Sequence, residues 1–306
     1  MYPAWFKELR ERLAPICHSP QQAHTEALWL VEHCLGLTAT ALLRSPSLPQ
    51  GEGAVLLQSL LHQRITQRKP LQHLVGYGWF YGRKFTVSPA VLIPRPETEG
   101  LVELALAELA TRQAPLVVAD AGTGSGCILL SLLLSPSPFG RGQGEGHSLP
   151  YSEGKGVVWY GLDASPEALV VAQVNAQTHL SPQQQATVQW LHSDWLAQVP
   201  RPIDVLVSNP PYIPPQHATT LAPEVANREP ATALFADDTE GLSAAKALLS
   251  QTQHLAHGAW VGLELGDDQP PLLATWLVTA KFGYTNIACH KDTAGVWRYL
   301  TAVFAT

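Results

Sequence analysis

The chain has 306 residues, 46% of them hydrophobic and 14% charged, which is too apolar for a disordered chain and long enough for two folded domains. Its net charge of −6 disfavours a nucleic-acid partner, because binding a polyanion usually needs a basic surface. The opening residues show no basic region before an apolar stretch, and no apolar run is long enough to cross a membrane, so we expect a cytosolic (cytoplasmic) protein. No disulfide framework or cysteine-rich metal site is expected, because the four cysteines stand far apart: Cys17, Cys34, Cys127 and Cys289.

Residues 1–77 have the apolar spacing of helices. Ala27, Leu30 and Val31 recur on one helical face, and a second such pattern spans residues 56–65. Seven basic and five acidic side chains give this part a charge of +2, whereas the rest of the chain carries −8. We therefore predict a helical N-terminal domain, 1–77, that docks a substrate while the remainder performs chemistry. A solvated helical cap is the alternative.

Residues 78–95 change to a strand-like texture. Aromatic and β-branched residues alternate with glycines here, which predicts a β-hairpin linker. Pro94 and Pro96 stiffen the connection that follows. Thr98 then stands where its side chain would cap the next helix, whose apolar residues continue to Leu109.

From residue 115 onward, short apolar runs alternate with amphipathic helical patterns. This alternation predicts a doubly wound, mostly parallel α/β sheet of seven strands, covered on both faces, in a domain that spans residues 96–306. Only a short gap separates the last two runs, and a short gap permits antiparallel pairing alone. The runs expected to form strands lie at 116–119, 157–160, 188–191, 203–207, 260–265, 285–289 and 296–304.

Residues 135–156 interrupt the alternation. Six of these 22 residues are glycine, four are serine and three are proline. Such a composition is typical of a flexible surface insertion, and we expect no catalytic role for it.

A glycine-rich turn follows the first strand of the expected sheet. Glycines at a strand-to-helix turn let the backbone approach a ligand closely, and the helix N-terminus beyond offers free N–H groups. Position 127 is cysteine, so the spacing is G-x-G-x-G rather than the dinucleotide fingerprint G-x-G-x-x-G. The turn points to a nucleoside-type cofactor, with a purely structural turn as the alternative. Its residues are Gly122, Thr123, Gly124, Ser125 and Gly126.

Asp163 ends the second strand, where an acidic residue commonly binds ribose hydroxyls. It lies 41 positions after Gly122, or 19 when the 22-residue insertion is left out, close to the usual separation of about 20. A carboxylate accepts hydrogen bonds from two vicinal hydroxyls. The alternative is that it caps the helix beginning at Pro166, although Ser165 is better suited to that. After the third strand, Trp195 offers a flat apolar surface for an adenine ring.

The fourth strand is followed by Asn209, Pro210, Pro211 and Tyr212, at the end of a parallel sheet where ligands bind. Prolines have no N–H, so this segment presents carbonyl acceptors, including the Asn209 side chain. Acceptors without donors suit an NH₂ substrate. Asn209 and the Pro210 carbonyl would hold its two hydrogens and leave the nitrogen lone pair free, while Tyr212 stacks on the planar group. A rigid proline turn is the alternative for this segment in isolation.

Together, the glycine-rich turn, Asp163 and segment 209–212 resemble the class I S-adenosylmethionine-dependent methyltransferases that modify planar NH₂ groups. Segments 72–76, 91–99 and 229–234 narrow the resemblance to the HemK/PrmC family, the peptide-chain-release-factor glutamine methyltransferases. The resemblance covers nearly the whole chain. It departs from the family pattern in the insertion and at Ala121, where the family usually has leucine.

The resemblance implies the methyl donor S-adenosylmethionine, held by residues 122–126, Asp163 and Trp195, with Asn209 beside it. It also implies that Asn209 and Pro210 are catalytic, and that residues 209–212 grip the glutamine in the Gly-Gly-Gln loop of a class I peptide chain release factor.

Two other functions are weighed against this one. A nucleic-acid adenine methyltransferase can use the same four-residue segment, but the charge of −8 outside residues 1–77 speaks against it. A non-catalytic nucleoside-binding module would require decay of the acceptor segment, which is intact. We expect a monomer with no direct nucleic-acid contact, no membrane contact and no metal, because no histidine pair has ligand spacing. No general base is assigned beside residues 209–212.

Overall fold

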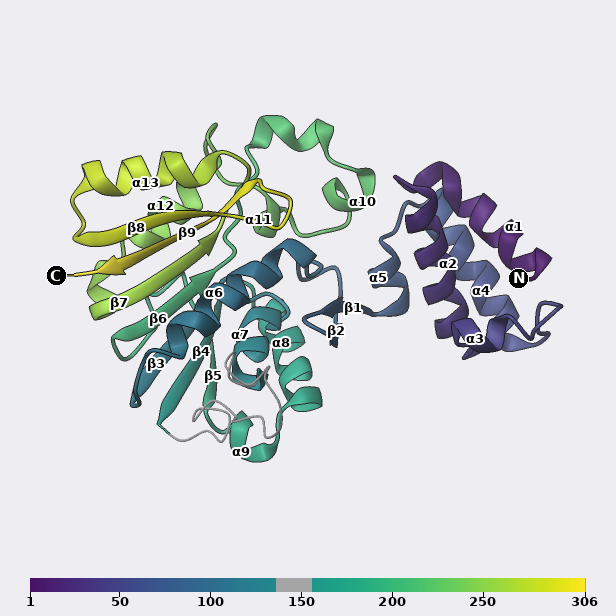
Figure 1. Ribbon diagram of the computed structural model, residues 1–306, viewed down its shortest axis with the longest axis horizontal. Helices are drawn as coiled ribbons and strands as arrows, with labels where there is room; N and C mark the ends of the chain where they lie inside the picture. The colour runs from purple at the N-terminus through teal and green to yellow at the C-terminus, as the bar shows by residue number, and fades with distance from the viewer. Residues whose placement is uncertain (136–155, 306) are drawn as a thin grey trace. The chain divides into compact units, whose positions relative to one another are not determined.

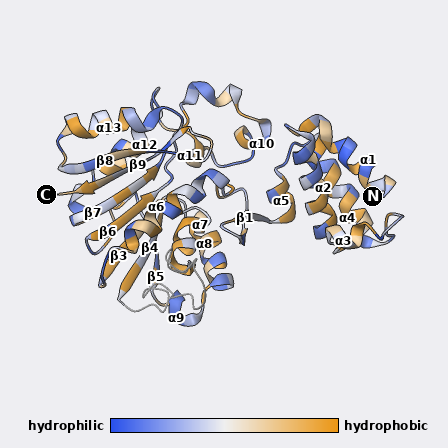
Figure 2. Cartoon of the chain, in the orientation of Figure 1, coloured by the Kyte–Doolittle hydropathy of each residue, from blue (hydrophilic) through white to orange (hydrophobic). Residues whose placement is uncertain are grey.

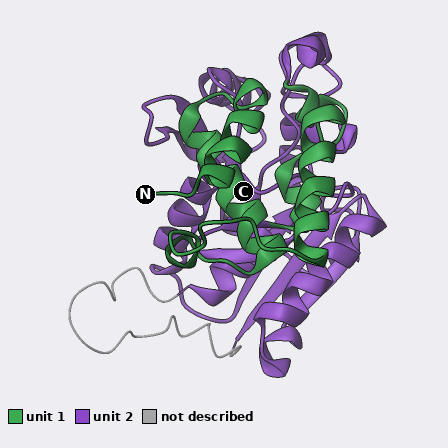
Figure 3. Ribbon diagram, turned by 90° about the vertical axis from the view of Figure 1, so that its right-hand side faces the viewer, with its two compact units in different colours: residues 1–77, 222–228 green, residues 78–221, 229–306 purple. Residues whose placement is uncertain are grey.

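The computed structural model describes residues 1–135 and 156–305, and the chain divides into two compact units (Figure 1 and Figure 3). Unit 1 comprises residues 1–77 and 222–228, and unit 2 comprises residues 78–221 and 229–306. The insertion expected at 135–156 lies outside the described residues except for its first and last positions. Within the described ranges, no helix has both the length and the apolar character needed to cross a membrane.

Unit 1 is helical, as its apolar spacing predicts. In its longest helix the Ser19 side chain accepts a hydrogen bond from the N–H of Gln22, Pro20 occupies the first turn, and Gly36 ends the helix with φ of 64°. The helices bury a core of their own around Phe6. The elements are α1 (Ala4–Leu13), η1 (Ala14–Ile16), α2 (Pro20–Leu35), α3 (Ala39–Leu42), α4 (Glu52–Thr66), α5 (Leu71–Val75) and α10 (Pro223–Ala226).

Unit 2 is built on a seven-stranded sheet in the order β5-β4-β3-β6-β7-β9-β8 (Figure 1). The first four neighbouring pairs are parallel, whereas β9 runs antiparallel to both β7 and β8. The expected fold class and the antiparallel pairing of the last two strands are therefore confirmed. The strands are β3 (Leu116–Ala121), β4 (Val157–Asp163), β5 (Val188–His192), β6 (Ile203–Ser208), β7 (Leu255–Glu264), β8 (Tyr284–Lys291) and β9 (Trp297–Phe304).

Helices cover both faces of this sheet. One face packs on α6 (Glu99–Leu109), α7 (Cys127–Leu134) and α8 (Pro166–His179), and the other on α12 (Ser243–Leu249) and α13 (Gln269–Ala280). Neighbouring residues of a strand point to opposite faces, so Trp159 joins the first core and Tyr160 the second. Figure 2 shows apolar residues running along the central strands, as expected of strands buried on both sides.

Shorter elements complete unit 2. The strands β1 (Tyr77–Phe80) and β2 (Arg83–Thr86) pair in a two-stranded sheet. Thr98 occupies the N-cap position of α6, but its side chain makes no capping hydrogen bond, so the expectation that it caps this helix is wrong. Its hydroxyl bonds instead to a residue that follows β6. The other short helices are η2 (Pro96–Thr98), α9 (Pro182–Gln185), η4 (Pro215–Thr220), α11 (Ala231–Leu234) and η5 (Thr252–His254).

Candidate active site

A cavity of about 460 Å³ lies within unit 2. Its lining includes residues that directly follow or end β3, β4, β5 and β6. The chain passes from β3 outward through β4 to β5 and then returns to β6 on the other side of β3. Ligands of open α/β sheets bind where the strand order reverses in this way, and the volume is typical of a small-molecule site.

The glycine-rich turn borders this cavity. Gly122 and Gly124 have φ of 72° and 55°, a left-handed region that favours glycine. The N–H groups of Gly122 and Thr123 each donate to the carbonyl of Leu162 at 2.8 Å, and the Thr123 hydroxyl donates to the buried Asp120 carboxylate at 2.7 Å. A Cβ atom at Gly124 would meet no atom within 4 Å. The turn is thus fixed on its inner side and leaves room for a ligand at Gly124.

Gly126 does not line the cavity. It precedes α7 with φ of 78°, and its N–H donates to the carbonyl of Thr123 at 2.8 Å. A Cβ atom here would lie 3.2 Å from the side chain of Ala172 and 3.4 Å from the ring of Trp190. In this structure its glycine character serves the close approach of α7 to the neighbouring elements.

Asp163 ends β4 and lines the cavity. Its Oδ2 accepts a hydrogen bond from the N–H of Gly124 and its Oδ1 one from the N–H of Ser165, each at 2.9 Å. Burial raises the pKa of Asp163, and these backbone donors act in the opposite direction. A carboxylate has about four lone-pair sites, so Asp163 keeps acceptor capacity for a ligand hydroxyl beside its backbone donors. Capping of α8 falls to the Ser165 side chain, which accepts from the N–H of Ala168 at 3.1 Å.

Trp195 lines the cavity after β5 and packs against the second core. Its backbone has a φ of 50°, which a non-glycine residue rarely adopts. Two hydrogen bonds hold this conformation. The Ser193 hydroxyl donates to the Trp195 carbonyl at 2.8 Å, and the N–H of Leu196 donates to the side-chain carbonyl of Gln251 at 2.8 Å. A Cβ atom at Gly122 would be 4.0 Å from the Trp195 ring, so the ring lies beside the glycine-rich turn.

The structure brings part of segment 209–212 to the same cavity. Asn209 and Pro211 line it, whereas Pro210 is buried and Tyr212 is half-buried outside the lining. The Asn209 Nδ2 donates a hydrogen bond to the Thr98 hydroxyl at 3.3 Å. This bond commits the NH₂ end of the side chain, so the carbonyl oxygen remains as the acceptor.

Gln269 anchors the backbone of Tyr212 and was not singled out by any sequence pattern. Its Nε2 donates to the carbonyl of Tyr212 at 2.9 Å and to that of Glu240 at 2.8 Å, and its Oε1 accepts from the N–H of Gly266 at 2.7 Å. Burial, reinforced by the Glu264 charge, raises the pKa of Tyr212 to about 12. The phenol is therefore neutral at neutral pH and does not serve as a base.

Arg95 and Glu229 form an ion pair at the site that the sequence analysis did not predict. Arg95 lines the cavity and pairs with Glu229 at 2.6 Å, and the second Glu229 oxygen accepts from the N–H of Ile93 at 3.1 Å. The Glu229 side chain is 1% exposed. In the sequence, both segments stand out only through the family resemblance. The signal that could have found the pair is an arginine beside prolines in one segment and an acid beside a proline in the other.

Comparisons with known proteins agree with this architecture. Residues 4–76 match the PrmC N-terminal domain family. Among solved structures, the catalytic domain of human METTL16 has a TM-score of 0.52 at 15% identity, over 83% of this chain and 82% of that one. At this identity the likeness concerns the fold alone. The sheet order and the cavity at its switch point define a doubly wound α/β protein with a small-molecule site at the carboxyl ends of its strands.

Relatives of higher identity specify the family. The release factor glutamine methyltransferase of Koribacter versatilis is 39% identical over 260 residues, which cover 82% of this chain and 81% of that protein. That of Cereibacter sphaeroides is 34% identical over 284 residues, covering 92% and 91%. The chain belongs to the release factor glutamine methyltransferase family, as its sequence motifs indicate.

Proposed function

We propose that this chain transfers a methyl group from S-adenosylmethionine to the side-chain amide nitrogen of the glutamine in the Gly-Gly-Gln motif of class I peptide chain release factors. Family membership supplies the reaction and the substrate class. The single structural observation that supports it most is Asn209, which lines the cavity while its NH₂ group is bound to Thr98. Its carbonyl oxygen is then available to a substrate NH₂ group and cannot be exchanged for a donor without breaking that bond.

The residues around the cavity fit the methyl donor. Gly124 leaves open space beside the backbone, Asp163 offers acceptor lone pairs suited to ribose hydroxyls, and the Trp195 ring offers a face for adenine. We assign donor binding to residues 122–126, Asp163 and Trp195, with Asn209 adjoining. Within this set, Gly126 does not line the cavity, and its lack of a side chain also lets α7 pack closely.

When bound, the donor supplies an electrophilic methyl group attached to a positively charged sulfur. An amide nitrogen is a weak nucleophile because its lone pair is delocalised into the carbonyl. Asn209 and the Pro210 carbonyl would hold the two N–H hydrogens, aim the lone pair at the methyl carbon and stabilise positive charge that develops on nitrogen. As the new C–N bond forms the C–S bond breaks, its electron pair stays on sulfur, and one N–H proton is released to water.

Pro211 and Tyr212 are the substrate-binding residues of the proposal. Pro211 lines the cavity beside Asn209. Gln269 fixes the position of the Tyr212 backbone through a hydrogen bond to its carbonyl. The phenol ring of Tyr212 would stack on the planar amide of the substrate.

We also propose that the helical domain, residues 1–77, docks the release factor, that residues 78–95 form the linker, and that residues 96–306 carry out the transfer. A monomer acting in the cytoplasm, where translation ends, without direct nucleic-acid contact, suits such a substrate. A nucleic-acid adenine methyltransferase is not favoured, because the chain outside residues 1–77 carries a charge of −8.

The test is incubation of the purified chain with methyl-labelled donor and one of three acceptors: a release factor, the same factor with the motif glutamine replaced by alanine, or duplex DNA. We expect label on the intact release factor alone, at a mass increase of one methyl group on the motif glutamine. Label on DNA, or equal label on the alanine variant, would contradict the proposal.

A further inference from the structure

Thr98 has an unusual position for a buried threonine. It is 3% exposed, it stands at the start of α6, and its hydroxyl makes no bond to that helix. Instead, Asn209 Nδ2 donates to it from the segment that follows β6. Thr98 also borders the cavity. The Thr98 hydroxyl therefore contacts Asn209, the acceptor residue of the site, and does not cap α6.

Burial raises the pKa of the Glu264 carboxyl group, and hydrogen bonding by the same Thr98 hydroxyl acts in the opposite direction because it favours the ionised form. Glu264 is the last residue of β7, the strand parallel to β6, and Ser208 and Leu263 are register partners immediately before the two site residues. The Glu264 side chain is almost fully buried, and among the described residues its Oε2 has no hydrogen-bond partner. A buried carboxyl oxygen without a hydrogen-bond partner is unusual, because buried polar atoms are normally hydrogen-bonded.

The direction of these bonds follows from the donors available. A carboxylate accepts only, so the single Thr98 O–H must donate to Glu264. The Thr98 oxygen is then left with lone pairs alone and can pair with the NH₂ end of Asn209 but not with its carbonyl end. The chain Glu264–Thr98–Asn209 thereby sets which end of the Asn209 amide is left for the substrate.

We propose that Glu264 and Thr98 are positioning residues that fix the Asn209 amide with its carbonyl oxygen toward the substrate nitrogen. This inference rests on the proposed function. Neither residue touches the reacting atoms; both act through Asn209. A flipped Asn209 would present hydrogens to the substrate NH₂ group and repel it, so a small change in this relay has a large effect on turnover.

Protonation of Glu264 would reverse the direction of these hydrogen bonds. A carboxylic acid donates its own proton to the Thr98 oxygen, which frees the Thr98 O–H to donate to the Asn209 carbonyl oxygen. The Asn209 amide would then turn its NH₂ group toward the substrate. Burial raises the pKa of Glu264 to about 7. The titratable and charged side chains that face this carboxyl group are Arg95, Glu97, Cys127, Tyr212, Arg298 and Tyr299.

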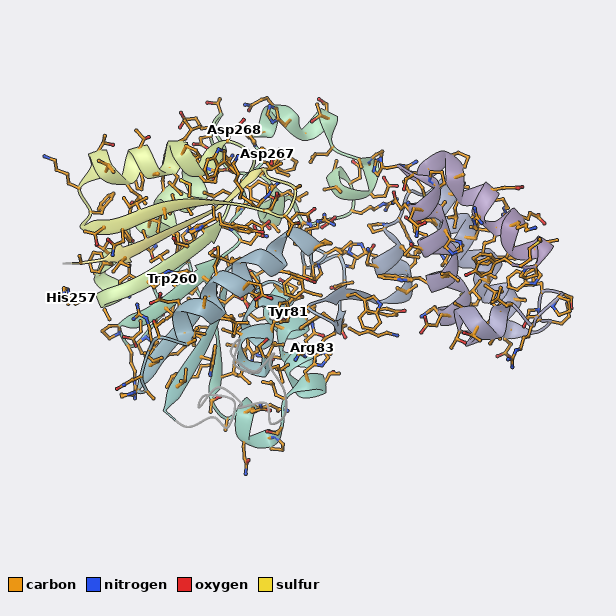
Figure 4. All side chains as sticks on the ribbon, viewed as in Figure 1. Tyr81, Arg83, His257, Trp260, Asp267 and Asp268 are labelled. Atoms are coloured by element: carbon orange, nitrogen blue, oxygen red, sulfur yellow. The ribbon has the colours of Figure 1, made fainter. Side chains whose placement is uncertain are left out.

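The two arginines among these neighbours favour the ionised form of Glu264, and Glu97 opposes it. Arg298 is itself paired with Asp267 at 2.7 Å and with Asp292 at 3.4 Å. Asp267 is labelled in Figure 4, where it lies near the start of α13, at the end of β7 that carries Glu264. With its charge shared in this way, Arg298 does not overcome the effect of burial, and we expect turnover to fall as the pH drops through about 7.

The test compares two variants at one position. Thr98→Val keeps the shape of the side chain and removes the hydroxyl, whereas Thr98→Ser keeps the hydroxyl. With a release factor as substrate, we expect Thr98→Val to lower kcat about tenfold or more and Thr98→Ser to stay within about threefold of the unchanged chain. The affinity for S-adenosylhomocysteine, measured by calorimetry, and the melting temperature should be similar in the two variants.

Equal kcat in the valine and serine variants would overturn the inference, as would a loss of kcat in Thr98→Val matched by an equal loss of S-adenosylhomocysteine affinity. Glu264→Gln supplies a second arm, because glutamine accepts the Thr98 hydrogen at every pH. Its kcat between pH 6 and 8 should be flat where that of the unchanged chain declines toward pH 6, and an undiminished decline would contradict the relay. Failure of the proposed function is distinguishable, since then the unchanged chain itself does not methylate the release factor.

Discussion

At the scale of single residues, Asn209 carries most of the proposed chemistry with one atom. Its NH₂ group is bound to Thr98, so the side-chain oxygen is the part that a substrate meets. The residues assigned to the methyl donor lie elsewhere, Gly124 in the turn after β3 and Asp163 at the end of β4, and their hydrogen bonds do not involve the Asn209 side chain. Loss of Asn209 should consequently affect turnover and donor binding to different degrees.

We predict that Asn209→Ala lowers kcat about 100-fold, because it removes an acceptor that holds the substrate nitrogen, while the affinity for S-adenosylhomocysteine changes less than about threefold. Steady-state kinetics and calorimetry on the same preparation measure both quantities. Gln189→Ala, which removes an exposed amide on β5, is the matched control and should leave both unchanged. Equal losses of kcat and affinity in Asn209→Ala would mean that the residue only supports the pocket.

The site residues that could be predicted from the sequence are those at or just after the end of a strand. Asp163, Trp195 and Asn209 each follow an apolar run, and the structure brings all three to one cavity. Thr98 was assigned by local spacing to the wrong partner, because a cap depends on i to i+3 geometry while its actual partner lies 111 positions away. The assignment of Gly126, Pro210 and Tyr212 to ligand contact stays a prediction.

At the scale of elements, the sheet could be predicted because strands buried on both faces are continuous apolar runs, and each of the seven runs became a strand. By contrast, the membership of α10 in unit 1 could not be predicted from the sequence. Its four residues have no periodicity of their own, and they join unit 1 through Glu224, which accepts hydrogen bonds from Arg64 at 2.7 Å and from Arg68 at 2.9 Å. An ion pair between residues so far apart in the chain cannot be predicted from a local sequence pattern.

Arg64 links three helices of unit 1. From α4 it binds both oxygens of Glu26 in α2, at 2.8 and 3.0 Å, and one oxygen of Glu224 in α10. We predict that Arg64→Ala lowers the free energy of unfolding of unit 1 by about 3–5 kcal/mol, because it leaves two carboxylates without their buried partner. Urea unfolding at pH 7 measures this. Arg12→Ala, whose guanidinium is exposed, should cost about 0.5 kcal/mol or less, and a similar cost at both positions would refute the prediction.

At the scale of the whole molecule, two of the buried acids described in unit 2 lie at or near the carboxyl ends of strands, Asp120 in β3 and Glu264 in β7. Burial raises the pKa of Asp120 to about 7 from an ordinary 3.8, and that of Glu264 to about 7 from 4.5. A carboxylate is stable in such surroundings only at a cost in folding free energy. Asp120 accepts the hydroxyl hydrogen bond of Thr123, and Thr98 favours the ionised form of Glu264, so this cost accompanies residues that border the cavity.

The raised pKa values determine how stability varies with pH. Between about pH 4 and 7 the folded chain holds protons that the unfolded chain has released, so the stabilisation is present at low pH and is lost as the pH rises through about 7. We predict that the free energy of unfolding falls by a few kcal/mol between pH 5 and 8. Asp120→Asn still accepts the Thr123 hydroxyl but cannot ionise, so its decline, followed by urea unfolding at several pH values, should be clearly shallower. Asp237→Asn, at an exposed position, should retain the full slope, and a wild-type slope in Asp120→Asn would show that this acid does not set it.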